Sequence, residues 1–226
     1  MKNYIIVSEK EWHRNLVKEL QEISENINWI LINVRNDFSF KNLQRLEPIQ
    51  IFIPHWSYII PSEIYNNFEC IVFHMTDLPY GRGGSPLQNL IIRGKKETKI
   101  SALRVEKGLD TGPIYLKKPL SLMGTAQEIF LRAKYIVKEM IIEIIDEQLI
   151  PVAQKGEITE FKRRKPENSN LEGIIETEKL YDQIRMLDCE GYPPAYIESE
   201  NFRFEFSRAS LKSKQEIIAD VRIIKK

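Results

Sequence analysis

One histidine and one aspartate stand where the chain is best suited to acid–base chemistry. His74 ends the apolar run 70–73 and is followed directly by the Gly/Pro-rich segment 75–86. Asp110 lies in a second loop, 108–112, which contains two glycines and follows the next expected strand. Open α/β folds place ligands at the carboxyl ends of their strands, and a histidine beside a carboxylate can act as an acid–base pair. The alternatives are purely structural roles: His74 as a packed core histidine, and Asp110 in an Asx-turn.

Short apolar runs alternate with helical segments, and these elements must position the two loops. Buried strands are predicted at four runs, 4–7, 29–32, 49–53 and 70–73. Apolar residues recur at helical spacing from Trp12 to Ile23, with Ser8 as the expected N-cap. The pattern predicts a Rossmann-like α/β fold with a mostly parallel sheet and flanking helices.

Later segments change this pattern. Strands expected at 99–105 and 113–116 are close enough in sequence to form an antiparallel pair. Thr125 is expected to cap a long helix. We predict a catalytic domain over 1–150, a polar linker over 151–170 and a small α+β subdomain over 171–226, with a helix at 177–187 and a hairpin turning near residues 200–201. That hairpin can pair with a second copy, so a homodimer is an open expectation.

Composition excludes some classes of protein. The formal net charge is +1, from 33 basic and 32 acidic residues, which argues against a nucleic-acid partner. No apolar stretch is long enough to span a membrane and no signal peptide is recognisable, so a cytoplasmic protein is expected. Cys70 and Cys189 favour two separate thiols, and three scattered histidines predict no metal site.

The segment from His74 to Gly112 resembles the 10-formyltetrahydrofolate-dependent formyltransferases, which include enzymes acting on methionyl-tRNA, glycinamide ribonucleotide and amino sugars. Three pieces follow one another in the family's order: His74-Met75-Thr76-Asp77-Leu78-Pro79, then the Arg-Gly loop 81–88, then 106–112 with Leu109-Asp110-Thr111-Gly112. An ordered set of motifs is far more specific than a lone glycine motif. The resemblance also covers the upstream segment 54–61 and the stretch 161–169, which is similar to sugar-acting members.

The resemblance implies an N-formyltransferase that uses 10-formyltetrahydrofolate as co-substrate. It implies catalytic roles for His74 and Asp110, as base or oxyanion donor and its carboxylate partner. The implied folate-binding residues are Tyr58, Ile60, Arg82, Gly83, Glu106, Gly108 and Leu109. The expected substrate-binding residues are Trp56, Asp77 and Glu9, and packing or loop capping are their bland alternatives.

One position departs from the family pattern. The family's asparagine two residues before the histidine is Val72 here. Loss of one oxyanion donor typically lowers turnover about 100- to 1000-fold. Another donor such as Asn89 or Gln88 can replace it, His74 can act alone, or the protein keeps the pocket without the activity.

The acceptor amine is predicted by elimination. The small C-terminal region and low net charge argue against tRNA, and the segment after the first strand has no glycine to cradle the phosphate of glycinamide ribonucleotide. A UDP-linked amino sugar is therefore the main expectation. The alternatives are a non-catalytic folate-pocket protein, an enzyme similar to methionyl-tRNA formyltransferase, and a hydrolase of formyltetrahydrofolate.

Overall fold

The computed structural model describes residues 1–226. Contacts divide them into two units, and each is described by itself. Unit 1 comprises Met1–Arg82, Lys99–Leu120 and Leu131–Glu160, and unit 2 comprises Gly83–Thr98, Ser121–Phe130 and Phe161–Lys226. This division interleaves the two units along the chain. The predicted division at residues 150 and 170 stays a prediction.

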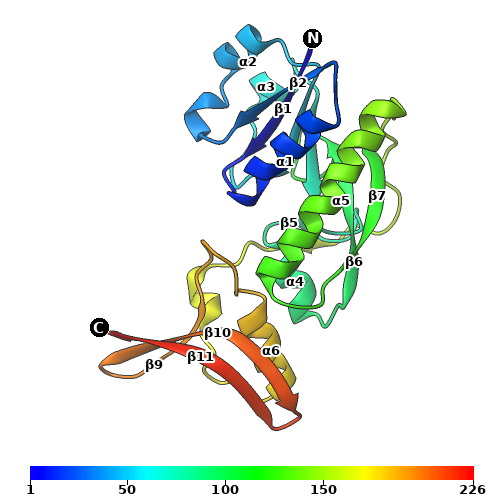
Figure 1. Ribbon diagram of the computed structural model, residues 1–226. Helices are drawn as coiled ribbons and strands as arrows, with labels where there is room; N and C mark the ends of the chain where they lie inside the picture. Colours follow the sequence, from blue (N-terminus) through cyan, green and yellow to red (C-terminus); the bar gives the residue numbers. More distant parts are fainter. The chain divides into compact units, whose positions relative to one another are not determined.

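Unit 1 is built on a six-stranded sheet with the order β2-β1-β3-β4-β6-β7 (Figure 1). Its strands are β1 (Lys2–Ser8), β2 (Ile27–Ile32), β3 (Gln50–His55), β4 (Cys70–His74), β6 (Glu97–Arg104) and β7 (Ile114–Ser121). The first four are parallel, and β6 runs antiparallel to β4, with His74 opposite Ser101. The predicted Rossmann-like, mostly parallel sheet is confirmed.

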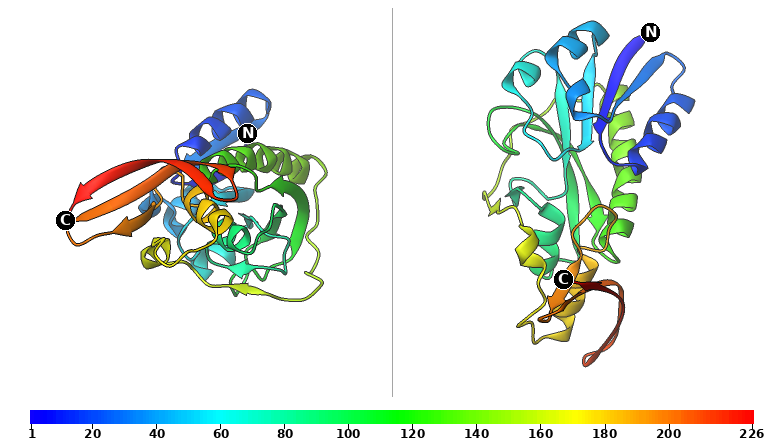
Figure 2. Two further views of the ribbon diagram at one scale, coloured as in Figure 1. Left: turned by 90° about the horizontal axis from the view of Figure 1, so that it is seen from below. Right: turned by 90° about the vertical axis from the view of Figure 1, so that its left-hand side faces the viewer.

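Helices cover both faces of this sheet. They are α1 (Trp12–Glu22), η1 (Arg35–Asp37), α2 (Phe40–Leu46), α3 (Ser62–Tyr65) and α5 (Ala126–Asp146). Leu43 of α2 and Ile64 of α3 pack on the apolar cluster formed by alternate residues of β1, β3 and β4. Side chains alternate between the faces of a strand, so the remaining strand residues face the side of α1 and α5, which Figure 2 shows beside each other. Ion pairs from Lys134 and Lys138 of α5 to Glu19 of α1 join these two helices.

The start of α1 differs from its prediction. The Ser8 hydroxyl does not cap this helix, whose N-cap residue is Glu11. Its oxygen lies 2.7 Å from Nδ1 of His13, and both residues are buried. Ser8 thus serves a buried polar pair because it still belongs to β1, four residues before the helix begins. Thr125, in contrast, caps α5 as predicted, exchanging hydrogen bonds with Glu128.

Unit 2 holds a short helix, α4 (Pro86–Ile92), a second helix, α6 (Thr177–Arg185), and the turn η2 (Pro166–Ser169). Its antiparallel sheet has the order β11-β10-β9, formed by β9 (Ala195–Glu198), β10 (Phe202–Ser213) and β11 (Glu216–Lys225). The predicted hairpin between β9 and β10 is present, but the sequence reading missed β11. The two-residue strands β5 (Arg82–Gly83) and β8 (Glu160–Phe161) pair with each other. None of the helices has the length and apolar character of a membrane span.

Candidate active site

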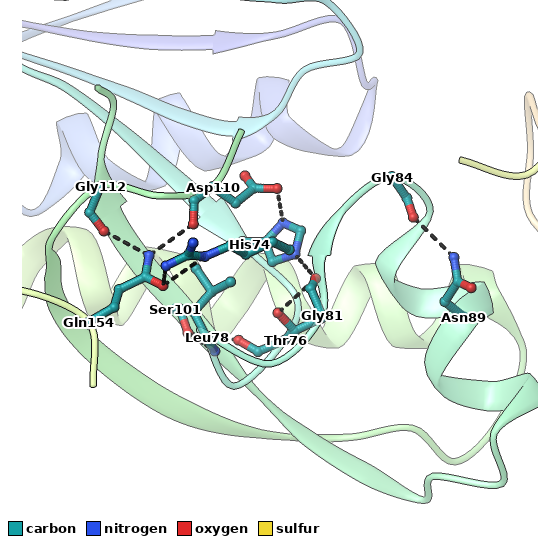
Figure 3. Close-up of polar contacts among 11 residues, drawn as sticks. His74, Thr76, Leu78, Gly81, Gly84, Asn89, Ser101, Asp110, Gly112 and Gln154 are labelled. Atoms are coloured by element: carbon teal, nitrogen blue, oxygen red, sulfur yellow. Dashed lines mark hydrogen bonds and ion pairs between the residues drawn. The ribbon is translucent and has the colours of Figure 1, made fainter. Parts of the chain in front are cut away.

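His74 lies at the carboxyl end of β4 and is buried, with a relative exposure of 8%. Its Nε2 is 2.8 Å from the carbonyl oxygen of Gly81, and its Nδ1 is 3.5 Å from Oδ2 of Asp110 (Figure 3). If Nε2 carries the proton donated to Gly81, Nδ1 is the nitrogen available as a base. The structure therefore brings together the two residues predicted to be catalytic, with Asp110 facing the basic nitrogen.

The loop 105–112 carries Asp110 to this position. It leaves the sheet near the amino end of β4, where Val105 N donates to Cys70 O at 2.8 Å, and returns to His74 at the other end. Gly108 has φ +107°, a conformation that L side chains rarely adopt. A Cβ on Gly112 would lie 1.8 Å from the carbonyl oxygen of Arg104. The two glycines thus allow the loop to turn and to lie against β6.

The segment after His74 is held by a buried serine. Ser101 Oγ donates to Thr76 O at 2.7 Å and accepts from Leu78 N at 3.3 Å. Thr76 and Ser101 are fully buried. Because Ser101 lies opposite His74 in the β4–β6 ladder, this pair of bonds fixes the chain at the point where it leaves the strand.

Val72 faces the same side of β4 as His74, two residues earlier, and packs against the apolar cluster below α2 and α3. It offers no hydrogen bond to a developing oxyanion. The suggested replacements have other partners: Asn89 Nδ2 donates to carbonyl oxygens of Gly84, Ser85 and Lys162, each at 3.0 Å. Gln88 Nε2 donates to Met186 O at 3.2 Å. Both amides support unit 2, and His74 remains the imidazole available at the site.

The residues implied in folate binding lie in three segments: after β3, in the loop 105–112 and in β5. Tyr58 and Ile60 follow β3, and Arg35 stacks over the Tyr58 ring at 4.1 Å. Glu106 pairs with Arg104 and lines an open groove of about 850 Å³ between α3 and residues 104–107. Gly108 and Leu109 lie in the loop of Asp110, where the Leu109 side chain is 56% exposed.

Arg82 and Gly83 form β5. The Arg82 guanidinium donates to Oε1 of Gln154 from both Nε (3.2 Å) and Nη2 (2.7 Å). Gly83 has φ +108°, and a Cβ there would lie 2.4 Å from the carbonyl oxygen of Phe161. Close approach between β5 and β8 therefore requires this glycine. A role of either residue in binding folate stays a prediction.

The three residues expected to bind the acceptor have structural partners or lie exposed. Asp77 forms ion pairs with Lys117 at 2.5 Å and Lys99 at 3.0 Å. Burial raises the pKa of Asp77, but the hydrogen bonds from the two lysines outweigh this and hold it below its ordinary value. Trp56 packs edge-on against Phe38, at 5.6 Å between ring centroids, and partly covers the apolar cluster.

Glu9 is exposed at the end of β1. Its role in binding an acceptor stays a prediction, as do the roles of Trp56 and Asp77.

Sequence reasoning missed Gln154. Its Nε2 donates to the carbonyl oxygens of Asp110 at 2.9 Å and Gly112 at 2.8 Å (Figure 3). A glutamine in a polar segment assigned as linker carries no local signal of this role. Only the partnership of Val152 with Ile114, an isolated antiparallel bridge, brings residue 154 beside the loop.

The fold is built on a Rossmann-like sheet, and the His74–Asp110 pair at the end of one of its strands is a candidate site for group transfer. Residues 16–144 match the family model described as "Formyl transferase", and residues 166–224 match that of the methionyl-tRNA formyltransferase C-terminal domain. The chain belongs to the formyl transferase family.

The similar proteins belong to a narrower group within this family. The methionyl-tRNA formyltransferase of Thermodesulfovibrio yellowstonii is 30% identical over 160 residues, 67% of this chain and 52% of that protein. The chain thus spans about half the length of the curated relatives that it matches. A solved methionyl-tRNA formyltransferase from Clostridium thermocellum is 49% identical, with a TM-score of 0.97 and full coverage of both chains. HypX from Aquifex aeolicus in complex with tetrahydrofolic acid shares the fold, at 16% identity and a TM-score of 0.73, covering 91% of this chain and 37% of HypX.

These comparisons overturn the predicted acceptor. The expectation of a UDP-linked amino sugar, and of no nucleic-acid partner, is wrong, because the relatives at 30% and 49% identity are methionyl-tRNA formyltransferases. A solved sugar N-formyltransferase from Shewanella shares only the fold, at 18% identity and a TM-score of 0.68, covering 88% of this chain and 94% of that chain. Net charge was a poor guide because contact with a phosphate backbone depends on local clusters of positive charge.

Proposed function

We propose that this protein transfers the formyl group of 10-formyltetrahydrofolate to the α-amino group of methionyl-tRNA. The observation that carries the proposal is the pairing of buried His74 with Asp110 in a chain 49% identical, along its whole length, to a methionyl-tRNA formyltransferase. The match of residues 166–224 to the C-terminal domain of such enzymes supports the same acceptor.

In the proposed reaction, the acceptor amine attacks the formyl carbon, and the bond from that carbon to N10 of the folate breaks. The amine loses a proton, which Nδ1 of neutral His74 is placed to accept. Asp110, 3.5 Å from Nδ1, stabilises the resulting imidazolium. The same N–H then returns the proton to the departing N10, so atoms and charges balance.

The tetrahedral oxyanion also needs a hydrogen-bond donor. The side chain at position 72 supplies none, so the imidazolium of His74 is the donor that the site offers. A single group that both moves the proton and stabilises the oxyanion predicts slower turnover than a site with a separate amide.

The folate is proposed to lie along the loop 105–112. This segment runs the length of β4, from Val105 beside Cys70 to Asp110 beside His74. Glu106, Gly108 and Leu109 would then hold the pterin, with Leu109 presenting an exposed apolar side chain to it. Tyr58 and Ile60, after the neighbouring strand β3, would contribute backbone groups.

The test is formylation of charged methionyl-tRNA by the purified protein with 10-formyltetrahydrofolate, following N-formylmethionine and tetrahydrofolate together. We expect both products in equal amounts, and a loss of about 100- to 10,000-fold in kcat for Asp110→Asn, which keeps the side chain's size. UDP-amino sugars serve as the control acceptor. Folate binding with no transfer to methionyl-tRNA would contradict the proposal, and release of formate without an acceptor would indicate a hydrolase instead.

A further inference from the structure

Gln154 reaches the active site through the register of a short antiparallel bridge. Val152 and Ile114 exchange both backbone hydrogen bonds, each at 2.8 Å. Two residues further on, Gln154 therefore falls opposite Gly112, two residues before Ile114. The half-buried Gln154 side chain lies beside the loop there, within hydrogen-bonding distance of the carbonyl oxygens of Asp110 and Gly112.

The amide group of Gln154 holds the loop that carries Asp110. It donates to the carbonyl oxygens of Asp110 and Gly112, at 2.9 and 2.8 Å. Asp110 itself has φ +54°, in the left-handed region that non-glycine residues adopt at an energetic cost. Two hydrogen bonds to the loop's main chain stabilise that unfavourable conformation and, with it, the direction of the carboxylate.

The amide oxygen of Gln154 binds the segment on the other side of the His74 ring. It accepts two hydrogen bonds from Arg82, the residue after Gly81. The carbonyl oxygen of Gly81 lies 2.8 Å from Nε2 of His74 and accepts its hydrogen bond. Both partners of the imidazole ring, the Asp110 loop and the Gly81–Arg82 turn, are therefore tied to one side chain. The amide cannot be reversed, because its NH₂ would then face the guanidinium and its oxygen two carbonyl oxygens.

We propose that Gln154 is a positioning residue, which sets the placement of Asp110 and of the Gly81 carbonyl around His74. The inference rests on the proposed function for its kinetic consequence, but the arrangement of the ring is independent of it. Gln154 touches neither nitrogen of His74 and acts only through the groups that do.

Three variants separate the contacts. Gln154→Met keeps the length of the side chain and removes all of its hydrogen bonds. Gln154→Glu keeps an oxygen for Arg82 but removes the donors to the loop. Gln44→Met, on the exposed face of α2, is the matched control.

Two measurements are made on each variant. The first is the pair of ¹⁵N shifts of the His74 imidazole, which report its tautomer in the protein without substrates. The second is the steady-state kinetics of formyl transfer.

In the wild type and in Gln44→Met we expect one tautomer, with the proton on Nε2. In Gln154→Met and Gln154→Glu we expect averaged shifts from two tautomers and a kcat lower by about 10- to 100-fold, because small misplacements of catalytic groups cost that much. KM for methionyl-tRNA should change less than about twofold, since binding contacts remain.

Wild-type shifts and kcat in both Gln154 variants would overturn the proposal. A lower melting temperature with unchanged shifts would assign Gln154 a purely structural role and would also overturn it. Wild-type behaviour in Gln154→Glu alone would show that only the Arg82 contact matters, which contradicts the loop-holding role. If the wild type formylates no tRNA, the proposed function fails, while the ¹⁵N shifts still decide the role of Gln154.

Discussion

At the scale of single residues, the site combines a retained pair with a missing donor. His74 and Asp110 lie 3.5 Å apart, as the proposed proton transfer requires, whereas Val72 presents methyl groups on the same face of β4. The valine packs against the apolar cluster of unit 1, so its exchange for a polar side chain affects both catalysis and stability.

Val72→Asn tests the missing donor directly. An amide two residues before His74 on the same face can reach an oxyanion that His74 also contacts, and we expect kcat to rise at least about tenfold, since such donors are worth up to 1000-fold. Burying the amide should lower the free energy of unfolding by about 1–3 kcal/mol. Val72→Ala is the control, because it loses packing without gaining a donor. An asparagine variant no faster than the alanine variant would show that another group already fills this role.

At the scale of elements, the candidate active site depends on how closely the loop 105–112 lies against β6. Gly112 has no space for a side chain, because its Cβ would meet the Arg104 carbonyl oxygen. The same loop is held from the other side by Gln154. Placement of Asp110 is therefore a property of three segments that are distant in sequence.

Gly112→Ala should move this loop. We expect the free energy of unfolding to fall by about 2 kcal/mol or more from overpacking and formyl transfer to fall with it, measured by urea unfolding and by kcat. Gly173→Ala is the matched control: its φ is +80°, but nothing lies within 4 Å of the added Cβ. In that variant the free energy of unfolding should fall by only about 1–2 kcal/mol, from the backbone strain that alanine introduces, and the activity should be kept. Equal effects of the two substitutions would argue against close packing at Gly112.

Two histidines, buried His13 in α1 and half-buried His55 at the end of β3, make unit 1 sensitive to acid. Burial, with help from the charges of His55, Lys134 and Lys10, lowers the pKa of His13 to about 3. Burial and Lys10 likewise lower the pKa of His55 to about 4. The unfolded chain binds protons at these residues near pH 6.5, so stability is full above that pH and is lost as pH falls toward 3.

His13→Asn removes one of these two groups while retaining an amide near the Ser8 hydroxyl. Each pKa unit between the folded and unfolded states is worth about 1.4 kcal/mol, so the wild type should lose several kcal/mol between pH 6.5 and 4. The variant should show a flatter dependence of the unfolding free energy on pH, with the remaining slope due to His55. Parallel curves for the two proteins would exclude His13 as a source of acid sensitivity.

At the scale of the whole molecule, overall charge conceals a local basic patch in unit 2. Asn89 of α4 binds the main chain at Lys162, and Arg93 stacks over the Phe161 ring at 4.5 Å, which brings the basic end of α4 beside residues 161–165. The exposed basic residues of these two segments are Arg93, Lys95, Lys96, Lys162, Arg163 and Lys165. This local charge would suit the phosphates of the proposed tRNA acceptor even though the chain's net charge is +1.

Replacing Lys162 and Lys165 together by serine should raise KM for methionyl-tRNA and leave kcat nearly unchanged. If both lysines contact phosphates, the slope of log KM against log salt concentration should decrease in magnitude by about 1.5–2. The exposed Lys212 and Lys214 at the tip of the β10–β11 hairpin, replaced in the same way, are the control. An equal change in both double variants would point to general electrostatic attraction.

Local patterns were sufficient for the sheet and its main helices. The apolar runs at β1 to β4 mark buried strands because both faces of a parallel sheet are covered, and Thr125 with Glu128 marks a helix start. The strand β11 was missed because its side chains alternate only weakly, although it pairs with β10 across a short turn. The capping role predicted for Ser8 was wrong for another reason, since its partner His13 is determined by burial and not by the spacing to the helix.

The sequence by itself determined the family of this protein, through the order of motifs that places it among formyltransferases, and pointed to the candidate site, a histidine at a strand end and an aspartate between two glycines. These features are local, and a short stretch of chain specifies each of them. Only the tertiary structure decided which groups surround His74, because the Asp110 loop, the Gly81 turn and Gln154 meet through hydrogen bonds between residues up to 72 positions apart. Such contacts depend on strand order and register, which residue spacing along the chain does not encode.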